Sequence, residues 1–311
     1  MTTQFHPPSP GTLRDQGAIG VGASLTRLLH AHGAHVFFGD ILDSPALALE
    51  KELASHPTAS SKIKFVHTDV TSYTDNLALF DAAYTACGRV DHALANAGLG
   101  EQGNFFDPAL TLESVREEPV KGVKVVDVNL KGELYFARIA AVYLRQPDVD
   151  GKAARVAEVS KSLTLVSSVA GFREDPGLYV YTASKHGVLG LMRSLRSMLI
   201  EAQPHPIRVN AVCPWMTRTR LVAGIEDDWH RAGLPSNTPE DVAGVIAGVF
   251  ADRGVHGAAL YIEGGNAWNI EEGLLQTRPE WLGAKQTADL DRGSELMGGG
   301  EHWTANMSSQ V

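Results

Sequence analysis

The chain has 311 residues, an ordinary globular composition and a formal net charge of −9, so it can bury a full core as one large α/β domain or two small ones. The acidic balance argues against nucleic acid or an anionic membrane as the main partner, and no apolar run approaches the roughly 20 residues that span a bilayer. The N-terminus has no apolar core of the kind a secretory signal needs, and Cys87 and Cys213 match no metal or disulfide pattern, so a reducing, cytoplasmic location is expected.

Short apolar runs alternate with segments of helical periodicity along most of the chain. In chain order we predict helix 23–33, strand 35–40, helix 45–56, strand 63–70, helix 77–88, strand 90–98, helix 123–144, strand 162–168, helix 179–202, strand 207–214, helix 239–252 and strand 257–265. Such alternation implies parallel strands joined by right-handed crossovers. The fold class is therefore α/β, a doubly wound, mostly parallel Rossmann-like sheet in a single domain.

The stretch RDQGAIGVGAS, residues 14–24, places Gly17, Gly20 and Gly22 just before the first predicted helix. Glycines let backbone amides approach a pyrophosphate, and the helix that follows adds its positive N-terminal end. Asp40 ends the next strand, where an acid accepts hydrogen bonds from an adenosine ribose and repels a 2′-phosphate. These residues predict a dinucleotide site; the alternative for Asp40 is a solvated side chain at a strand end.

Two further segments carry groups suited to proton transfer. Tyr181 and Lys185 are four residues apart on one helix face, and a nearby ammonium favours the phenolate form of a tyrosine, which makes Tyr181 a candidate acid/base. Tyr179 lacks a lysine at this spacing. Ser168 follows a buried strand and can hydrogen-bond a substrate oxygen; a turn cap is its alternative, and Ser167 is the weaker candidate of the pair.

The motifs GAIGVG, DVT, ANAG, VNLKG, VSSVAG, YTASK and CPWMTRT, together with Asp40, occur in the order and spacing of the short-chain dehydrogenase/reductase family. The resemblance covers roughly residues 17–265. The later run GGNAWNIEEGLLQTRPEWLG, residues 264–283, is similar to that of fungal members that tailor secondary metabolites.

This resemblance implies an oxidoreductase that interconverts a secondary alcohol and a ketone on a small apolar metabolite, with NAD preferred and NADP possible. Tyr181 would be the acid/base, Lys185 would hold the nicotinamide ribose, Ser168 would orient the reacting oxygen, and Asn129 would hold a water in a proton relay. The implied cofactor-binding residues are Gly17, Ile19, Gly20, Gly22, Asp40, Asp69, Asn96, Gly98, Tyr181, Lys185, Pro214 and Thr217.

The chain departs from the family pattern at several positions. Ala95 stands where an Asn is usual, Trp215 replaces a Gly after Pro214, and Asp15–Gln16 replace Thr-Gly. The residues before them, HPPSPGTLR, cannot form the apolar central strand because their prolines lack N–H donors. The first strand is therefore expected to be degraded or missing. Altered splicing or a misassigned start is the favoured explanation, and a diverged protein is the other.

From these features we expect three segments: an atypical N-terminal segment, 1–16; a dinucleotide-binding catalytic domain, 17–268; and a C-terminal tail, 269–311, in which residues 283–311 are mostly irregular. Residues 146–161 are expected to be a surface insertion. The family also implies a homo-oligomer. No metal site is expected, because the histidines of HAHGAH lack a nearby carboxylate or thiolate. The alternative function is a catalytically impaired binding or regulatory protein with a damaged nucleotide loop.

Overall fold

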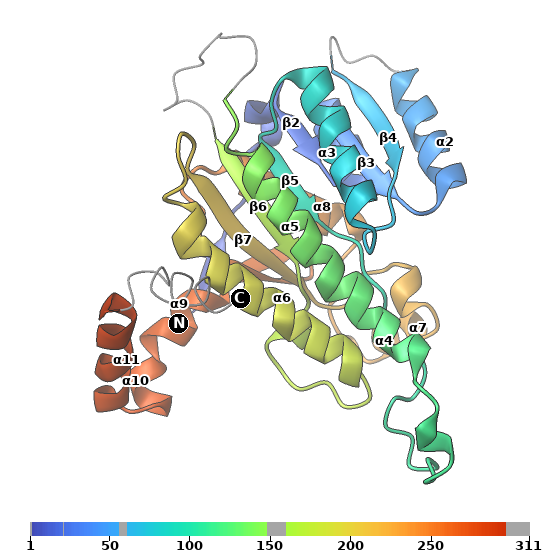
Figure 1. Cartoon of the computed structure of the whole chain (residues 1–311), viewed down its shortest axis with the longest axis vertical. Helices are drawn as coiled ribbons and strands as arrows, with labels where there is room; N and C mark the ends of the chain where they lie inside the picture. The colour runs from blue at the N-terminus through green and yellow to red at the C-terminus, as the bar shows by residue number, and fades with distance from the viewer. Residues whose placement is uncertain (1, 21, 56–60, 148–159, 297–311) are drawn as a thin grey trace, which may run out of the picture.

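One nine-stranded sheet forms the centre of the computed structural model, which describes all residues except 1, 21, 56–60, 148–159 and 297–311 (Figure 1). The strand order is β1-β9-β8-β7-β6-β5-β2-β3-β4. The strands are β1 Thr3–Phe5, β2 Gly17–Ile19, β3 His35–Asp40, β4 Ile63–His67, β5 His92–Ala95, β6 Lys161–Val166, β7 Ile207–Pro214, β8 Ala259–Glu263 and β9 Asn266–Asn269. Strands β2 to β8 pair in parallel, whereas β9 is antiparallel to β8 and β1. The predicted doubly wound sheet is confirmed.

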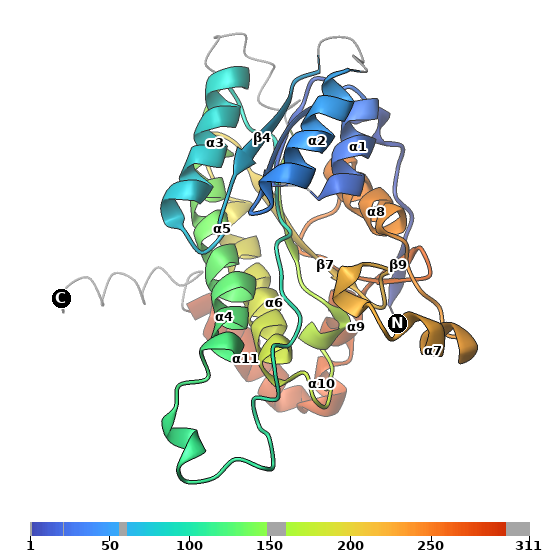
Figure 2. The same cartoon turned by 90° about the vertical axis from the view of Figure 1, so that its right-hand side faces the viewer.

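Helices cover both faces of the sheet (Figures 1 and 2). On one face, α1 Ala23–Ala31, α2 Asp43–Ala54 and α8 Pro239–Ala251 bury one apolar cluster. On the other, α3 Tyr73–Cys87, α5 Gly132–Tyr143 and α6 Tyr179–Leu199 bury a second. The predicted helix 123–144 is divided: α4 Val120–Val126 is followed by a π-helical turn at Asp127–Lys131 and then by α5. A short helix, α7 Glu226–Arg231, follows β7.

The central strand is present but only three residues long. This corrects the expectation of a missing strand and agrees with the expectation of a degraded one. Gly17–Ile19, expected in the glycine loop, form β2 between β3 and β5 and are buried. Ala18 pairs with Val36 on one side and His92 on the other. Since the prolines before residue 11 cannot supply the strand, the next residues that fit between these two neighbours take its place.

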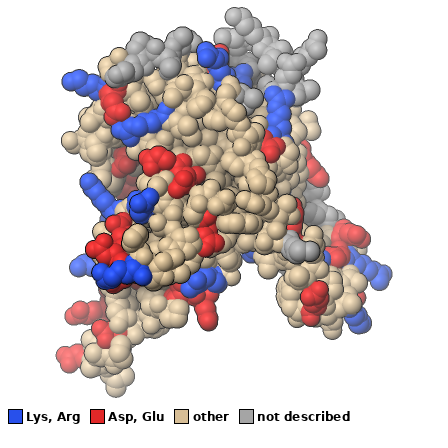
Figure 3. Space-filling view, turned by 180° about the vertical axis from the view of Figure 1, so that it is seen from behind, with Lys and Arg blue, Asp and Glu red and all other residues tan. Residues whose placement is uncertain are grey.

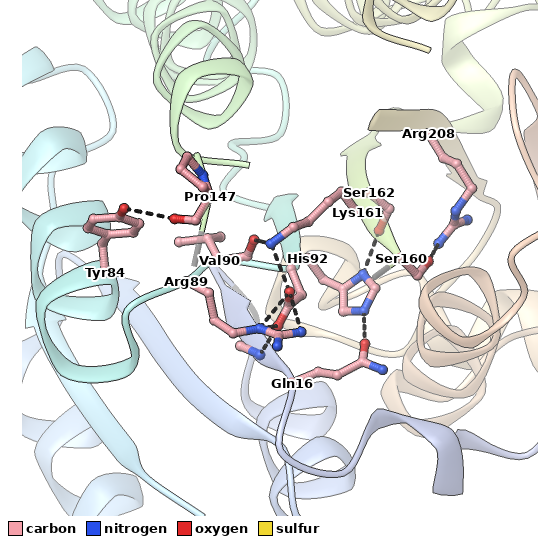
Figure 4. Close-up of polar contacts among 12 residues, drawn as sticks. Gln16, Tyr84, Arg89, Val90, His92, Pro147, Ser160, Lys161, Ser162 and Arg208 are labelled. Atoms are coloured by element: carbon pink, nitrogen blue, oxygen red, sulfur yellow. Dashed lines mark hydrogen bonds and ion pairs between the residues drawn. The ribbon is translucent and has the colours of Figure 1, made fainter. Parts of the chain in front are cut away.

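A polar network at the amino ends of β2, β5 and β6 anchors this short strand (Figure 4). The Asp91 carboxylate accepts hydrogen bonds from Gly17 N at 2.8 Å and from Lys161 Nζ at 2.9 Å. Burial alone would raise the pKa of Asp91, but Lys161 and Arg89 hold it below its usual value. The network therefore keeps a buried carboxylate charged and fixes the start of β2 to the rest of the sheet.

The His92 imidazole extends this network. Its two ring nitrogens face Gln16 Oε1 and Ser162 Oγ (Figure 4). Its ring also stacks on Phe250, with the ring centroids 4.7 Å apart. Burial lowers the pKa of His92 to about 3, so the ring is neutral near neutral pH. Because the Gln16 carbonyl can only accept, Nε2 carries the hydrogen and Nδ1 accepts from Ser162.

At one edge of the sheet, β1 near the N-terminus pairs with β9. The chain continues as α9 Ile270–Gln276, α10 Arg278–Trp281 and α11 Ala284–Leu296, so the prediction of a mostly irregular segment from residue 283 is wrong over α11. Glu271 in α9 pairs with Arg193 and Arg196 in α6 at 2.7 and 2.9 Å, which fastens α9 to the domain. Most of the predicted insertion at 146–161 lies outside the described residues.

Acidic and basic side chains are interspersed on the face seen from behind in Figure 3. Among the described residues, no helix is both long and apolar enough to cross a membrane. The segment before α4 projects away from the body (Figure 2), and its side chains Phe106, Leu112 and Val115 are exposed.

Candidate active site

A cavity of about 570 Å³ opens at the carboxyl ends of β2, β3 and β5, where ligands bind in open α/β sheets. Its volume lies within the range of small-molecule and cofactor sites. Six predicted cofactor residues line it: Gly20, Gly22, Asp40, Asp69, Asn96 and Gly98. Two other predicted residues, Gly17 and Ile19, lie in β2 instead, outside the cavity lining; their backbone groups pair with neighbouring strands.

Gly20 and Gly22 lie between the end of β2 and the start of α1. Gly20 has φ +81°, and a Cβ there would lie 2.3 Å from the Leu94 carbonyl oxygen, so this position accepts only glycine. Gly22 is the N-cap of α1 and provides no side-chain cap to its first amides. These amides, with the positive end of the helix, are suited to an anionic group such as a pyrophosphate. The shortened loop therefore keeps the anion-binding helix end.

The adenosine side of the predicted site carries the acids Asp40 and Asp69, and the bases Arg27 and Lys124 also line the cavity. Asp40 is exposed at the tip of β3, and its Oδ1 accepts from Leu42 N at 2.9 Å. Arg27 lines the same cavity but forms a two-point ion pair with Glu52 at 3.0 and 2.7 Å. Two hydrogen bonds from Thr71 lower the pKa of Asp69. The carboxylate of Asp40 is therefore exposed in the cavity, whereas the guanidinium of Arg27 is already paired with Glu52.

Asn129 lies in the π-helical turn and connects three segments. Its side chain accepts from Leu99 N at 2.7 Å, donates to Leu99 O at 2.9 Å, and contacts Ser184 Oγ in α6 at 3.2 Å. A Cβ added at Gly98 would lie 3.5 Å from Asn129 Oδ1 and 3.7 Å from Lys185 Nζ. The structure thus brings Asn129 and Lys185 together behind the cavity wall at Gly98.

Lys185 is a buried ammonium with two neighbours. Its Nζ donates to Val166 O, at the end of β6, at 2.7 Å and lies 3.6 Å from Glu133 Oε1 in α5. Glu133 is 2% exposed and lines the cavity, and neither of its oxygens has a hydrogen-bond partner within the described structure. Burial raises the pKa of Glu133 to about 8, although Lys185 acts in the opposite direction. Sequence reasoning missed this acid; its only signal was its spacing of four residues from Asn129.

Tyr181 lies one helical turn before Lys185 in α6 and is half-buried. Glu101 fixes the start of this helix, because its carboxylate accepts from Tyr181 N at 2.8 Å and from Val180 N at 3.3 Å. A carboxylate at a helix N-terminus is stabilised by the free amides there. Glu101, a second residue that the sequence reading missed, therefore holds the backbone of the predicted acid/base.

The two serines after β6 have different contacts. Ser167 Oγ donates to the Lys185 carbonyl at 2.8 Å and so ties α6 to the sheet. Ser168 Oγ accepts from Ala170 N at 3.2 Å and caps a short turn, the alternative considered for it. That bond uses a lone pair and leaves the Ser168 O–H able to donate. Of the two, Ser168 is the hydroxyl suited to a substrate oxygen.

Pro214 and Thr217 lie at and after the end of β7. The cavity lining does not include these two residues, nor the other predicted site residues Asn129, Ser168, Tyr181 and Lys185. Thr217 Oγ donates to Trp215 O at 3.0 Å and accepts from Asn237. The Trp215 ring packs edge-to-face on Trp229 with centroids 4.9 Å apart. The substitution of tryptophan for glycine therefore builds an aromatic wall on the loop after β7.

The sequence matches the family model described as short chain dehydrogenase over residues 16–229. The chain belongs to this family. Short-chain dehydrogenases are oxidoreductases that bind NAD(P), and the fold, the strand-end cavity and the Tyr181–Lys185 spacing agree with that membership.

Relatives and solved structures give the same result. A short-chain dehydrogenase/reductase, ascJ, of Acremonium egyptiacum is 31% identical, covering 90% of this chain and 85% of its own. The 5′-hydroxyaverantin dehydrogenase of Dothistroma septosporum is 28% identical, with 82% and 85% covered. A Burkholderia cenocepacia short chain dehydrogenase, solved in complex with NADP, superposes with a TM-score of 0.65 at 23% identity over 82% of this chain and 98% of its own. The resemblance to fungal secondary-metabolite tailoring members is thereby confirmed.

Proposed function

We propose that this short-chain dehydrogenase interconverts a secondary alcohol and a ketone on a small apolar metabolite, and that it prefers NAD to NADP. One observation carries the proposal: the cavity at the strand tips joins the uncapped N-terminus of α1, Asp40 at the tip of β3 and the wall behind which Asn129 and Lys185 meet. The lining residues therefore fit the adenosine and pyrophosphate part of a dinucleotide, and Lys185 and Asn129 lie behind the wall at Gly98, on the side where the nicotinamide would bind.

When bound, the nicotinamide ring supplies the hydride acceptor in oxidation and the hydride donor in reduction. Tyr181 removes the hydroxyl proton of the alcohol, or returns it to the ketone, because its neighbour Lys185 stabilises the phenolate. The Ser168 O–H donates to the substrate oxygen, where negative charge develops. Asn129 holds the segment at Leu99 against α6 and lies where a proton relay from Lys185 would run.

The preference for NAD rests on charge at the adenosine side. Asp40 is exposed in the cavity, and the arginine that could balance a 2′-phosphate is held by Glu52. A carboxylate at this position accepts hydrogen bonds from the ribose hydroxyls of NAD and repels the 2′-phosphate of NADP.

The test is turnover. Purified protein is incubated with NAD or NADP and a panel of cyclic and aromatic secondary alcohols, and nicotinamide absorbance is followed, with primary alcohols as the matched control. Formation of reduced NAD with a secondary alcohol supports the proposal. Dinucleotide binding without turnover on any alcohol or ketone, or no dinucleotide binding at all, would instead favour the impaired binding or regulatory protein, for which the three-residue length of β2 is the supporting observation.

We also propose a homo-oligomer in the cytoplasm. Apolar side chains are exposed on three helices of one sheet face, namely Val123, Leu134, Val142 and Met198, and both cysteines are free thiols. Light scattering coupled to size exclusion gives the subunit number, and a monomer at micromolar concentration would refute assembly. A fluorescent fusion gives the location.

A further inference from the structure

Glu133 is a buried acid that the proposed chemistry leaves without a role. It projects from α5 into the cavity, is 2% exposed, and has no hydrogen-bond partner on either oxygen among the described residues. Burying a carboxyl group without partners is costly. A group kept at such a cost beside a cavity is a candidate for function rather than for packing.

The nearest charged group is the Lys185 ammonium, 3.6 Å from Glu133 Oε1, and both side chains are almost fully buried. Lys185 also donates to Val166 O at 2.7 Å. An ammonium has three N–H groups. With one directed at the end of β6 and one toward α5, the orientation of the third is fixed.

A second contact lies one helical turn away. Asn129 precedes Glu133 by four residues, and Ser184 precedes Lys185 by one; Asn129 Nδ2 and Ser184 Oγ are 3.2 Å apart. Residues four apart lie on one face of a helix, and both Asn129 and Glu133 contact residues of α6. The two helices are thus joined by two successive polar contacts, both beside Gly98 or the cavity it lines.

We propose that Glu133 is a positioning residue for Lys185: it holds the ammonium between α5 and the end of β6, so that its remaining N–H is directed at the ligand in the cavity. This inference rests on the proposed function, in which Lys185 contacts the nicotinamide ribose. Glu133 itself acts only through the lysine and transfers no proton in this account.

A double-mutant cycle on NADH affinity tests the coupling. In fluorescence titrations at pH 9, the carboxyl group of Glu133 is above its pKa of about 8 and therefore charged, and Glu133→Gln removes that charge. We expect this change to weaken NADH binding by about tenfold in the wild-type background and by less than about twofold when Lys185→Met is already present, because the effects of contacting residues are not additive. Equal effects in both backgrounds, or unchanged or tighter binding by Glu133→Gln alone, would overturn the proposal. The control is Glu271→Gln, a buried acid paired with Arg193 and Arg196, which should lower stability without changing NADH affinity.

A second readout needs no dinucleotide. With ¹⁵N-labelled lysine, the resonance that disappears in Lys185→Met identifies the Lys185 ammonium. We expect it to exchange slowly with water in the free wild-type protein and to exchange faster or shift in Glu133→Gln, or in Glu133→Met if the glutamine variant does not fold. If the Lys185 ammonium in the wild-type protein exchanges with water as fast as the ammonium groups of surface lysines do, the proposal is contradicted. If the wild-type protein binds no NADH yet shows the held ammonium, the proposed function fails while the Glu133–Lys185 contact stands.

Discussion

Two buried acid–lysine pairs lie at opposite ends of the parallel strands, and they differ in how their partners are arranged. At the amino ends, Asp91 accepts from Gly17 N, Lys161 and Arg89 (Figure 4). At the carboxyl ends, Glu133 has Lys185 at 3.6 Å and no hydrogen bond within the described residues. A buried acid whose hydrogen-bonding positions are all occupied helps to stabilise the fold. A buried acid beside a cavity whose positions are unoccupied can still interact with a ligand or with a residue that binds one.

The contrast also explains how the chain keeps its fold with a central strand of three residues. Asp91 and His92 at the start of β5 hold Gly17 and Gln16 from the amino side, so β2 is anchored before it reaches the cavity. The polar network that anchors β2 lies at the amino ends of the strands, and the candidate site lies at their carboxyl ends.

The largest expected effect comes from a substitution that removes activity at the carboxyl ends of the strands without disturbing the network at their amino ends. Tyr181→Phe removes the proton donor and acceptor but keeps the ring, so we expect kcat to fall by about 10²–10⁴-fold and NADH affinity to change by less than about threefold. Steady-state kinetics and fluorescence titration measure the two. A variant with normal turnover would show that Tyr181 is not the acid/base.

Asp91→Ala tests the amino end in the same way. It leaves Lys161 buried without its carboxylate and Gly17 N without its acceptor, so the free energy of unfolding should fall by about 3–5 kcal/mol. Urea unfolding provides the measurement. Asp228→Ala, which removes an exposed partner of Arg231, is the control and should change stability by less than about 0.5 kcal/mol. Similar values for the two variants would mean that the network does not anchor the sheet.

The pH dependence of stability sharpens the comparison for Glu133. Its pKa in the folded protein is about 8, against an ordinary 4.5, so the folded state holds a proton that the unfolded state has lost between those values. Wild-type stability therefore falls as pH rises through this window, by at most about 1.4 kcal/mol per pH unit. The Glu133→Gln variant should not lose stability in this way. Its melting temperature should therefore rise relative to that of the wild-type protein as the pH increases from 5 to 9. Parallel curves would contradict the raised pKa.

The smallest effect concerns the choice of cofactor. Asp40→Ala removes the charge that opposes a 2′-phosphate, and we expect the ratio of the NADPH to the NADH dissociation constant to fall by about tenfold, equivalent to roughly 1.4 kcal/mol. Competition titrations give the ratio. Asp43→Ala, which removes the exposed partner of His67, should leave it unchanged; an equal shift in both variants would indicate a general field effect.

Much of the fold could be predicted because strands such as His35–Asp40 and helices such as Tyr179–Leu199 carry strong apolar periodicity. Gly17–Ile19 could not be assigned to a strand, because three small or apolar residues carry no periodicity and their conformation is decided by pairing with β3 and β5. Helix α11 was missed because its sequence is polar and has few apolar residues to mark a buried face.

The candidate site was predictable where chemistry follows a motif, as for Asp40, Asn129 and Lys185, whose surroundings the structure now describes. Their catalytic and binding roles stay predictions. Glu133 and Glu101 lie outside any such motif: in the sequence each is an ordinary acid, and only the packing of α5 and the loop after β5 against α6 makes one a partner of Lys185 and the other a cap for Tyr181.

The most direct measurement is a calorimetric titration of NADH into the wild-type protein and into Gly22→Leu. Gly22 has φ −78°, which any residue tolerates, and a side chain there would cover the first amides of α1 beside Asn96. We expect saturable one-site binding by the wild-type protein and affinity at least about tenfold weaker in the folded variant. Absence of binding at millimolar NADH, or equal affinity in both proteins, would contradict a dinucleotide site at this end of the sheet.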